Sequence, residues 1–176
     1  MGTSGRRRAI VWTVVALVAG VGASGGARER GDVPAPRAQG LQEVEVVGVV
    51  VDPRTQTPTV ILQGKRDKRA FAMVIGLAEA TGIALPLQGV TPPRPLTHDL
   101  FMTVFGRLNV ALIRVVITDL RDDTYFATVH LTSGGSEMVL DSRPSDAIAL
   151  AVRARVPVLV EDRVFDKSGA PGRPHI

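Results

Sequence analysis

The stretch that decides the fold covers residues 141–153, which read Asp-Ser-Arg-Pro-Ser-Asp-Ala-Ile-Ala-Leu-Ala-Val-Arg. It leads from the end of a strand into a helix, with Asp141 and Ser142 able to cap the helix and Pro144 suited to its first turn. Residues 147–152 are apolar on nearly every helical face, and a helix of this kind is buried. Its polar groups therefore have to lie at its N-terminal end. Two interpretations fit: ordinary helix capping, or a polar site at a strand end, where open α/β arrangements bind ligands.

The composition indicates one domain with appendages. The chain has 176 residues, of which 45% are hydrophobic and 4% aromatic, so aliphatic side chains have to fill the core. It contains no cysteine, which excludes disulfides, thiolate metal sites, a cysteine nucleophile and a lipid anchor on cysteine.

The basic character of the chain belongs to its beginning. Residues 1–40 carry six arginines against Glu29 and Asp32, whereas residues 41–176 carry 15 basic and 15 acidic side chains. A nucleic-acid binder usually shows a basic footprint in its folded domain. The total charge of this domain shows no such footprint.

The first 27 residues have the pattern of a secretory signal peptide. Three arginines at 6–8 precede an apolar run at 9–20, and small residues follow at 21–27. The run is shorter than the roughly 20 residues that span a bilayer. We expect residues 1–27 to be a cleaved signal peptide or an uncleaved N-terminal membrane anchor. The protein would then be exported, either periplasmic or secreted, or anchored to the inner membrane.

Residues 28–42 are polar and rich in proline and glycine, so we expect a flexible linker there. The folded part is expected at 43–166, and residues 167–176 are expected to form a disordered tail. Strands are predicted at 44–51, 59–63, 70–75, 110–118, 124–132, 137–140 and 156–160. Helices are predicted at 77–84, at 97–108 and over the opening stretch, and residues 161–166 start a last helical turn. Pro157 indicates that the final strand lies at a sheet edge.

The N-terminal ends of two predicted helices, which we call helix mouths, share one pattern. Residues 94–99 and 143–146 each contain an Arg-Pro pair, then a hydroxyl side chain, then an aspartate in the first helical turn. Each can be a separate cap, with Thr97 capping the earlier helix. If the fold brings the two mouths together, the resulting site contains a set of seven side chains: Glu79, Arg94, His98, Asp99, Asp141, Arg143 and Asp146.

This set has the chemistry for phosphodiester cleavage. Carboxylates bind Mg²⁺ or Mn²⁺ through hard oxygens, and the metal activates water. Arginine offers a fork to phosphate, and histidine moves protons near neutral pH. Spacing alone is weak evidence, and the sequence has none of the HExxH, P-loop, GxSxG or dinucleotide motifs. A histidine beside a helix N-terminus, such as His98, is more often structural than catalytic, and His130 is expected to be a sheet or surface residue.

The chain resembles the bifunctional nuclease domain family. The resemblance covers about residues 43–166, and its motifs lie at 74–80, 94–100, 114–120, 124–127 and 141–151. It implies an α+β fold with a mixed sheet and a homo-oligomer. The predicted strand at 59–63 pairs back on that at 44–51 as a hairpin, so we expect a single compact domain with a mostly antiparallel sheet and two or three helices. This member departs from the family at Thr81-Gly82, where the short helix usually continues with better helix formers.

The family name implies hydrolysis of DNA and RNA, and the residue roles come from side-chain chemistry. Asp141 and Asp146 are nominated as metal ligands or base, with Glu79 as a further ligand, and His98 is nominated as proton carrier with support from Asp99. Arg94 and Arg143 are nominated for phosphate. We expect an exported nuclease of low sequence specificity, assisted by Mg²⁺ or Mn²⁺. The alternative is a non-enzymatic domain for small-anion binding or assembly, which the neutral domain charge and the scarcity of base-stacking aromatics favour.

Overall fold

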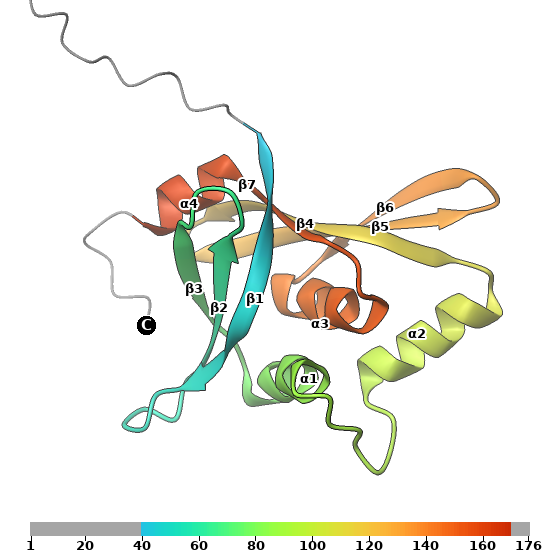
Figure 1. Cartoon of the computed structure of the whole chain (residues 1–176), viewed down its shortest axis with the longest axis horizontal. Helices are drawn as coiled ribbons and strands as arrows, with labels where there is room; N and C mark the ends of the chain where they lie inside the picture. Colours follow the sequence, from blue (N-terminus) through green and yellow to red (C-terminus); the bar gives the residue numbers. More distant parts are fainter. Residues whose placement is uncertain (1–39, 170–176) are drawn as a thin grey trace, which may run out of the picture. The chain divides into compact units, whose positions relative to one another are not determined.

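The computed structural model describes residues 40–169, and Figure 1 shows their arrangement. The expected signal peptide, most of the expected linker and the expected tail from residue 170 onward lie outside the described residues. Residues 167–169 belong to the fold, because the last helix continues through Ser168.

One seven-stranded sheet forms the framework, in the order β3-β2-β1-β7-β4-β5-β6. The strands are β1 (Leu41–Val51), β2 (Pro58–Gly64), β3 (Ala70–Val74), β4 (Ala111–Arg121), β5 (Thr124–Ser133), β6 (Ser136–Ser142) and β7 (Val158–Glu161). All neighbouring strands pair antiparallel except β4 and β7, which pair parallel. The predicted mixed, mostly antiparallel sheet in an α+β fold is confirmed.

Within residues 40–169, four helices accompany the sheet: α1 (Leu77–Leu87), α2 (Thr97–Arg107), α3 (Pro144–Ala154) and α4 (Asp162–Ser168). This is one more than the highest number predicted, because residues 162–168 form a complete short helix. Helix α1 also extends beyond the predicted end at residue 84 and includes Pro86. Helices α1 and α2 pack against α3, which packs against β4 and β5 (Figure 1).

The buried helix predicted at residues 147–152 is confirmed. Residues 147–151 are all buried, and Ile148 is fully enclosed in the core formed with Val115, Ile117 and Val129 of the sheet. Burying a side chain such as isoleucine contributes about 1.5–3 kcal/mol. The N-terminal end of α3 is therefore held in place by the body of the helix, and this places Arg143 and Asp146.

The sheet curls, so that strands distant in its order approach one another. The ring of Phe71 on β3 stacks on that of Tyr125 on β5, with 5.8 Å between centroids. Phe165 of α4 meets Phe71 edge-on at 5.2 Å. Helix α4 thus closes the core between the two halves of the curled sheet.

The predicted edge position of the last strand is wrong. Strand β7 lies inside the sheet, between β1 and β4. Pro157 precedes the strand by one residue, and its carbonyl accepts a hydrogen bond from the Val115 backbone N–H at 3.1 Å. Because Pro157 contributes only its carbonyl to the pairing with β4, its missing N–H removes no bond from the sheet.

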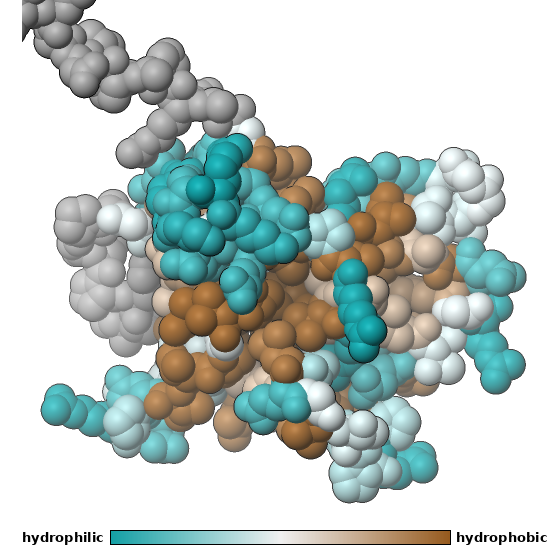
Figure 2. Space-filling model, in the orientation of Figure 1, coloured by the Kyte–Doolittle hydropathy of each residue, from teal (hydrophilic) through white to brown (hydrophobic). Residues whose placement is uncertain are grey.

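The surface is divided into polar and apolar regions. Figure 2 shows hydrophilic residues gathered over the β2–β3 turn and α4, and hydrophobic residues over parts of β1 and β2. On β1, Val47, Val50 and Val51 are about half exposed. No helix within residues 40–169 is long and apolar enough to cross a membrane.

Candidate active site

Helix α3 begins directly after β6, with Arg143 as its N-cap residue and Pro144 as its first residue. Asp141 and Ser142 do not cap it, since the helix start has no side-chain cap among the described residues and the Ser142 hydroxyl donates to the Arg143 carbonyl. The predicted caps are therefore wrong. Pro144 has its φ angle set for a helix and no N–H to satisfy, which reduces the need for a cap.

The polar groups converge on Arg143. Its Nε and Nη2 donate to the two carboxylate oxygens of Asp146 at 2.7 and 3.1 Å. Its Nη1 donates to Oε1 of Glu79, in the first turn of α1, at 2.8 Å. Arg143 thus joins the N-terminal ends of α1 and α3, and three of its five N–H groups are engaged within the described chain.

His98, in the first turn of α2, completes the cluster. Its Nε2 lies 3.2 Å from Oδ1 of Asp146, and its side chain is only 13% exposed. The ring lies against Gly82 of α1, where a Cβ atom would stand 3.1 Å from Nδ1. A glycine inside a helix costs about 0.5–1 kcal/mol relative to alanine. The close approach of the imidazole is the physical reason for the weak helix former at this position.

The cluster is charged at neutral pH. Burial alone would raise the pKa of Asp146, but hydrogen bonds from Arg143 and His98 hold that pKa below its ordinary value. The pKa of Arg143 is raised, mainly by its hydrogen bonds to Asp146 and the negative charge of that carboxylate, and to a smaller extent by Glu79. Asp146 therefore remains a carboxylate that can orient an imidazole and a guanidinium together.

Two surface depressions open beside the cluster, and His98, Arg143 and Asp146 line both of them. The first, which we name the α1–α2 depression, has a volume of about 400 Å³ and also includes Glu79 and Gly82. The second, the α2–β6 depression, has a volume of about 410 Å³. Its remaining wall is largely apolar and includes Phe101, Phe105, Val129, Leu140 and Leu150.

Asp99 does not join this cluster. One of its carboxylate oxygens accepts from the Leu96 backbone N–H at 2.8 Å, and the other accepts from Nε of Arg153 at 2.6 Å. The pKa of Asp99 is lowered by its hydrogen bond from Arg153 and by that from the Leu96 backbone N–H. Together these outweigh burial, which would raise the pKa. Leu96, rather than Thr97, is the N-cap residue of α2. Asp99 therefore acts in capping and in joining two helices.

Arg153 is a structural residue that sequence reasoning missed. Its side chain is 8% exposed, and its Nη1 donates to the backbone carbonyls of Gly82 and Ala149 at 2.6 and 2.9 Å. Together with its bond to Asp99, this ties α3 to α1 and α2. An arginine in the last turn of a helix is expected to lie at the surface and interact with the negative end of the helix dipole. The sequence therefore carries no signal for this buried role.

Two other nominated residues lie apart from the central bonds. Asp141 lines the α2–β6 depression and pairs with Thr128 in the sheet, and within residues 40–169 its side chain makes no hydrogen bond or ion pair. Arg94 is exposed on the connection between α1 and α2 and lines neither depression. The structure thus brings together Glu79, His98, Arg143 and Asp146.

The donor set does not fit a divalent metal. Glu79 and Asp146 are each bonded to Arg143, whose positive charge occupies the place that a cation would take between them. Among residues 40–169, no three His, Cys, Asp or Glu side chains gather as metal ligands. Mg²⁺ and Mn²⁺ require several oxygen ligands around one point. The described residues therefore lend no support to metal assistance, which stays an untested prediction, and the proposed chemistry does not depend on it.

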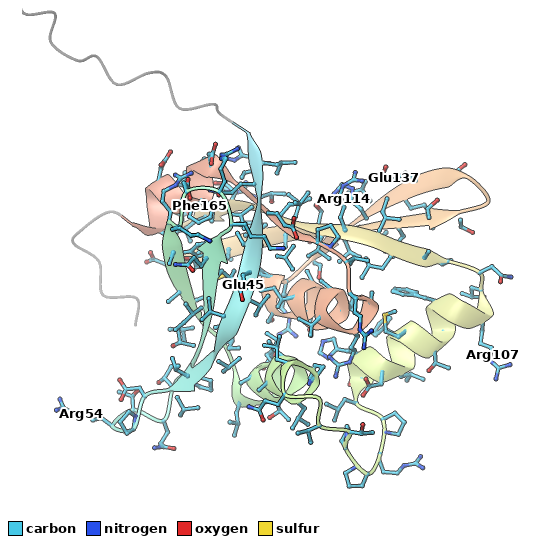
Figure 3. The ribbon with its side chains drawn as sticks, viewed as in Figure 1. Glu45, Arg54, Arg107, Arg114, Glu137 and Phe165 are labelled. Atoms are coloured by element: carbon cyan, nitrogen blue, oxygen red, sulfur yellow. The ribbon has the colours of Figure 1, made fainter. Side chains whose placement is uncertain are left out.

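A second Arg–His–carboxylate cluster lies elsewhere on the sheet. Figure 3 shows Arg114 and Glu137 side by side over β4 to β6, and Nη2 of Arg114 donates to Oε1 of Glu137. Nδ1 of His130 lies 2.7 Å from the same oxygen, and its Nε2 lies 3.1 Å from Oγ1 of Thr128. Strand alternation places His130 on the face opposite Val129 and the core. This cluster provides a matched control for the first one.

Comparison with known proteins identifies the family. Residues 60–172 match the family model described as the bifunctional nuclease domain, which is more than half of the chain. The chain belongs to the bifunctional nuclease domain family. The predicted resemblance is confirmed.

Relatives of this family member differ in coverage. An uncharacterized protein of Mycobacterium tuberculosis is 39% identical over 129 residues, which are 73% of this chain and 77% of the relative. Bifunctional nuclease 1 of Oryza sativa subsp. indica is 33% identical over 86 residues, 47% of this chain and 26% of that protein. Bifunctional nuclease 2 of Arabidopsis thaliana is 27% identical over 106 residues, 51% of this chain and 32% of that protein. The chain spans about a third or less of these plant relatives.

Proposed function

We propose that this family member is a nuclease of low sequence specificity that hydrolyses phosphodiester bonds of DNA and RNA. The observation that carries the proposal is the His98–Asp146–Arg143 arrangement at the edge of two depressions. The names of the plant relatives support the same class of reaction.

His98 has the position of a proton carrier. When Asp146 accepts from its Nε2–H, Nδ1 is left as the acceptor. Gly82 lets the imidazole pack closely against α1 because it has no Cβ, and both residues line the α1–α2 depression. In the proposed reaction a water oxygen attacks phosphorus, the water proton passes to Nδ1, and the bond to the leaving oxygen breaks. His98 then returns the proton to that oxygen, so that the imidazole is neutral again.

Arg143 is placed to bind a phosphate group of the substrate. Its side chain is 65% exposed, and two of its five N–H groups are not used by the bonds to Asp146 and Glu79 within residues 40–169. These two can donate to phosphate oxygens, where negative charge increases in the transition state. Glu79 and Asp146 fix the plane of the guanidinium for this contact.

The test is a cleavage assay on single-stranded DNA and RNA, with chelator, with Mg²⁺ and with Mn²⁺. We expect Asp146→Asn and His98→Gln to lose about 10²–10⁴-fold in rate, the usual contribution of acid–base catalysis. Glu137→Gln and His130→Gln are matched controls, because they alter a carboxylate and an imidazole that contact each other in the other cluster. The chelator arm tests the predicted metal dependence independently.

Equal loss in both pairs of variants would contradict the assignment of the chemistry to His98 and Asp146. No cleavage by the wild type under any metal condition would overturn the nuclease proposal. Equal cleavage by wild type and Asp146→Asn would place the reaction at another site.

The second candidate function is a non-enzymatic domain for small-anion binding or assembly. Two observations favour it: the carboxylates of Glu79 and Asp146 are both already paired with Arg143, and apolar side chains are exposed over β1 (Figure 2). Calorimetric binding of inorganic phosphate to a wild type that cleaves nothing would support this function.

We further propose that the protein is exported and forms a homo-oligomer. The signal-like residues 1–27 support export, and mass spectrometry of the mature protein from a cell fractionation tests it. Leu100, Val104 and Leu108 form an exposed stripe on α2 that supports self-association. Sedimentation of wild type and Leu108→Glu measures whether the stripe holds the copies together.

A further inference from the structure

The α2–β6 depression combines an apolar aromatic wall with a polar end. Phe101 and Phe105 of α2 and Leu140 of β6 lie on its wall, and His98 and Arg143 lie at the end that it shares with the α1–α2 depression. Pockets of about 300–1,000 Å³ hold small ligands, and this one measures about 410 Å³. A ligand that fits it has a planar apolar part and an anionic part.

Phe101 presents an aromatic ring to solvent. It is 49% exposed, and its ring lies 6.1 Å from that of Phe105 at a tilt of 56°. Helix α2 has no buried residue, although half of its positions are apolar. An exposed aromatic ring inside a concave surface is typical of a binding site rather than of core packing.

We propose that the α2–β6 depression is a nucleobase subsite, which receives one unpaired base while the adjoining phosphate lies on Arg143. The proposal rests on the proposed function and adds its substrate class, namely single-stranded or locally unpaired nucleic acid. A base inside a duplex is stacked on its neighbours and cannot enter such a site without being turned out.

The chemistry of the wall agrees with low sequence specificity. Every base has a π-face, so stacking on an aromatic ring accepts all of them. The charges allow the phosphate contact, because Arg143 lines the depression beside Asp141 and Asp146 and has two N–H groups that its bonds to Asp146 and Glu79 leave unused within residues 40–169. The apolar wall holds the base and Arg143 holds the phosphate.

The experiment measures binding of the full-length protein by fluorescence anisotropy. The probes are a labelled oligothymidine strand, an abasic strand of the same length, and a duplex, with a gel to verify that each remains intact. We expect wild type to bind oligothymidine about tenfold more tightly than the abasic strand or the duplex, as base–aromatic stacking predicts.

Phe101→Ala is expected to reduce this preference to near equality, and Phe101→Leu to reduce it in part, because leucine keeps apolar bulk without a π-face. Val139→Ala is the matched control: Val139 precedes Leu140 on β6 and is 54% exposed, but does not line the depression. It should retain the preference. Thermal unfolding of each variant verifies that it is folded.

The outcomes separate the two proposals. Equal binding of both single strands together with cleavage would leave the nuclease proposal intact and overturn the subsite. Binding of neither strand, without cleavage, would overturn both. Sedimentation of the same samples tests whether a second copy of the chain occupies the depression instead. If the wild type is a dimer that Phe101→Ala dissociates, and neither protein prefers strands with bases, the subsite is overturned and the depression is assigned to self-association.

Discussion

Gly82 shows how one residue without a side chain controls the position of His98, the candidate general base. Its Cα faces the imidazole of His98, and the carbonyl of the same residue accepts from Arg153. The sequence shows only a poor helix former in a short helix. In the fold, the same position is a contact point of α1, α2 and α3.

Gly82→Ala is expected to lower cleavage by about tenfold or more, since small displacements of a catalytic group have large effects on rate. The added methyl group would stand 3.1 Å from Nδ1 of His98. The measurement is kcat on an RNA strand. Gly106→Ala in α2 is the control, because its Cβ would meet nothing within 4 Å. Unchanged kcat in Gly82→Ala would show that the close packing of His98 against Gly82 has no role.

The charge of Asp146 predicts a pH dependence of stability. Its pKa is depressed in the folded protein, so the ion pair contributes stability above the unfolded-state pKa of about 3.9. That contribution is lost as pH falls through the folded-state pKa. We expect urea unfolding to show Asp146→Asn less stable than wild type at pH 6 and the difference to shrink below about pH 4. A difference that is constant between pH 6 and pH 3 would contradict the ion pair.

At the scale of elements, α3 organises the site through both of its ends. Its N-terminal end presents Arg143 and Asp146, and its C-terminal turn holds Arg153 against α1 and α2. The apolar body of the helix fixes the distance between these ends. The helix therefore couples the geometry of the site to the packing of the two smaller helices.

Arg153→Met is expected to destabilise the protein by about 2 kcal/mol, a value discounted from that of a buried pair because Asp99 is 33% exposed. The substitution keeps apolar bulk but leaves Asp99 and the Gly82 carbonyl without their donor. Chemical denaturation measures it. Arg107→Met is the control, because Arg107 is exposed at the end of α2 (Figure 3). Equal effects of the two substitutions would refute the bridging role.

Arg155→Gly is expected to stabilise α3 by about 1 kcal/mol. Arg155 follows the helix with φ of 56°, in the left-handed region that costs residues with a Cβ atom about 1–2 kcal/mol. Glycine is the preferred residue there. The midpoint of thermal unfolding should rise for Arg155→Gly and not for Arg155→Ala, which keeps the strain. A lower midpoint for the glycine variant would show that the Arg155 side chain contributes more than the strain costs.

At the scale of the whole molecule, residues 40–169 contain one continuous core that both halves of the sheet share. Strand β7 joins the halves, since it pairs with β1 on one side and β4 on the other. A fragment of residues 40–169 is therefore expected to unfold in one cooperative transition, with the same midpoint as the full chain. Calorimetry measures this. Two transitions would contradict the shared core, and a midpoint lowered by several degrees would show that residues outside 40–169 contribute to stability.

Much of the fold could be predicted because local patterns decide it. Runs of strand-forming residues separated by turn residues predicted the strands, and the apolar run at 147–152 predicted the buried helix. The central place of β7 could not be predicted, because Pro157 has the same sequence pattern before an edge strand as before an inner one. Only the parallel pairing of β7 with β4 decides between the two.

The sequence predicted which kinds of residue form the candidate site, but not which of the nominated residues meet there. The sequence by itself determined that Glu79, His98, Arg143 and Asp146 stand in first turns of helices or at their caps, where polar groups are accessible. The tertiary structure alone decided that these four meet, while Asp99 bonds to Arg153 and Arg94 stays outside. The physical reason is that helix starts depend on neighbours in the chain, whereas the contact between them depends on how α1, α2 and α3 pack.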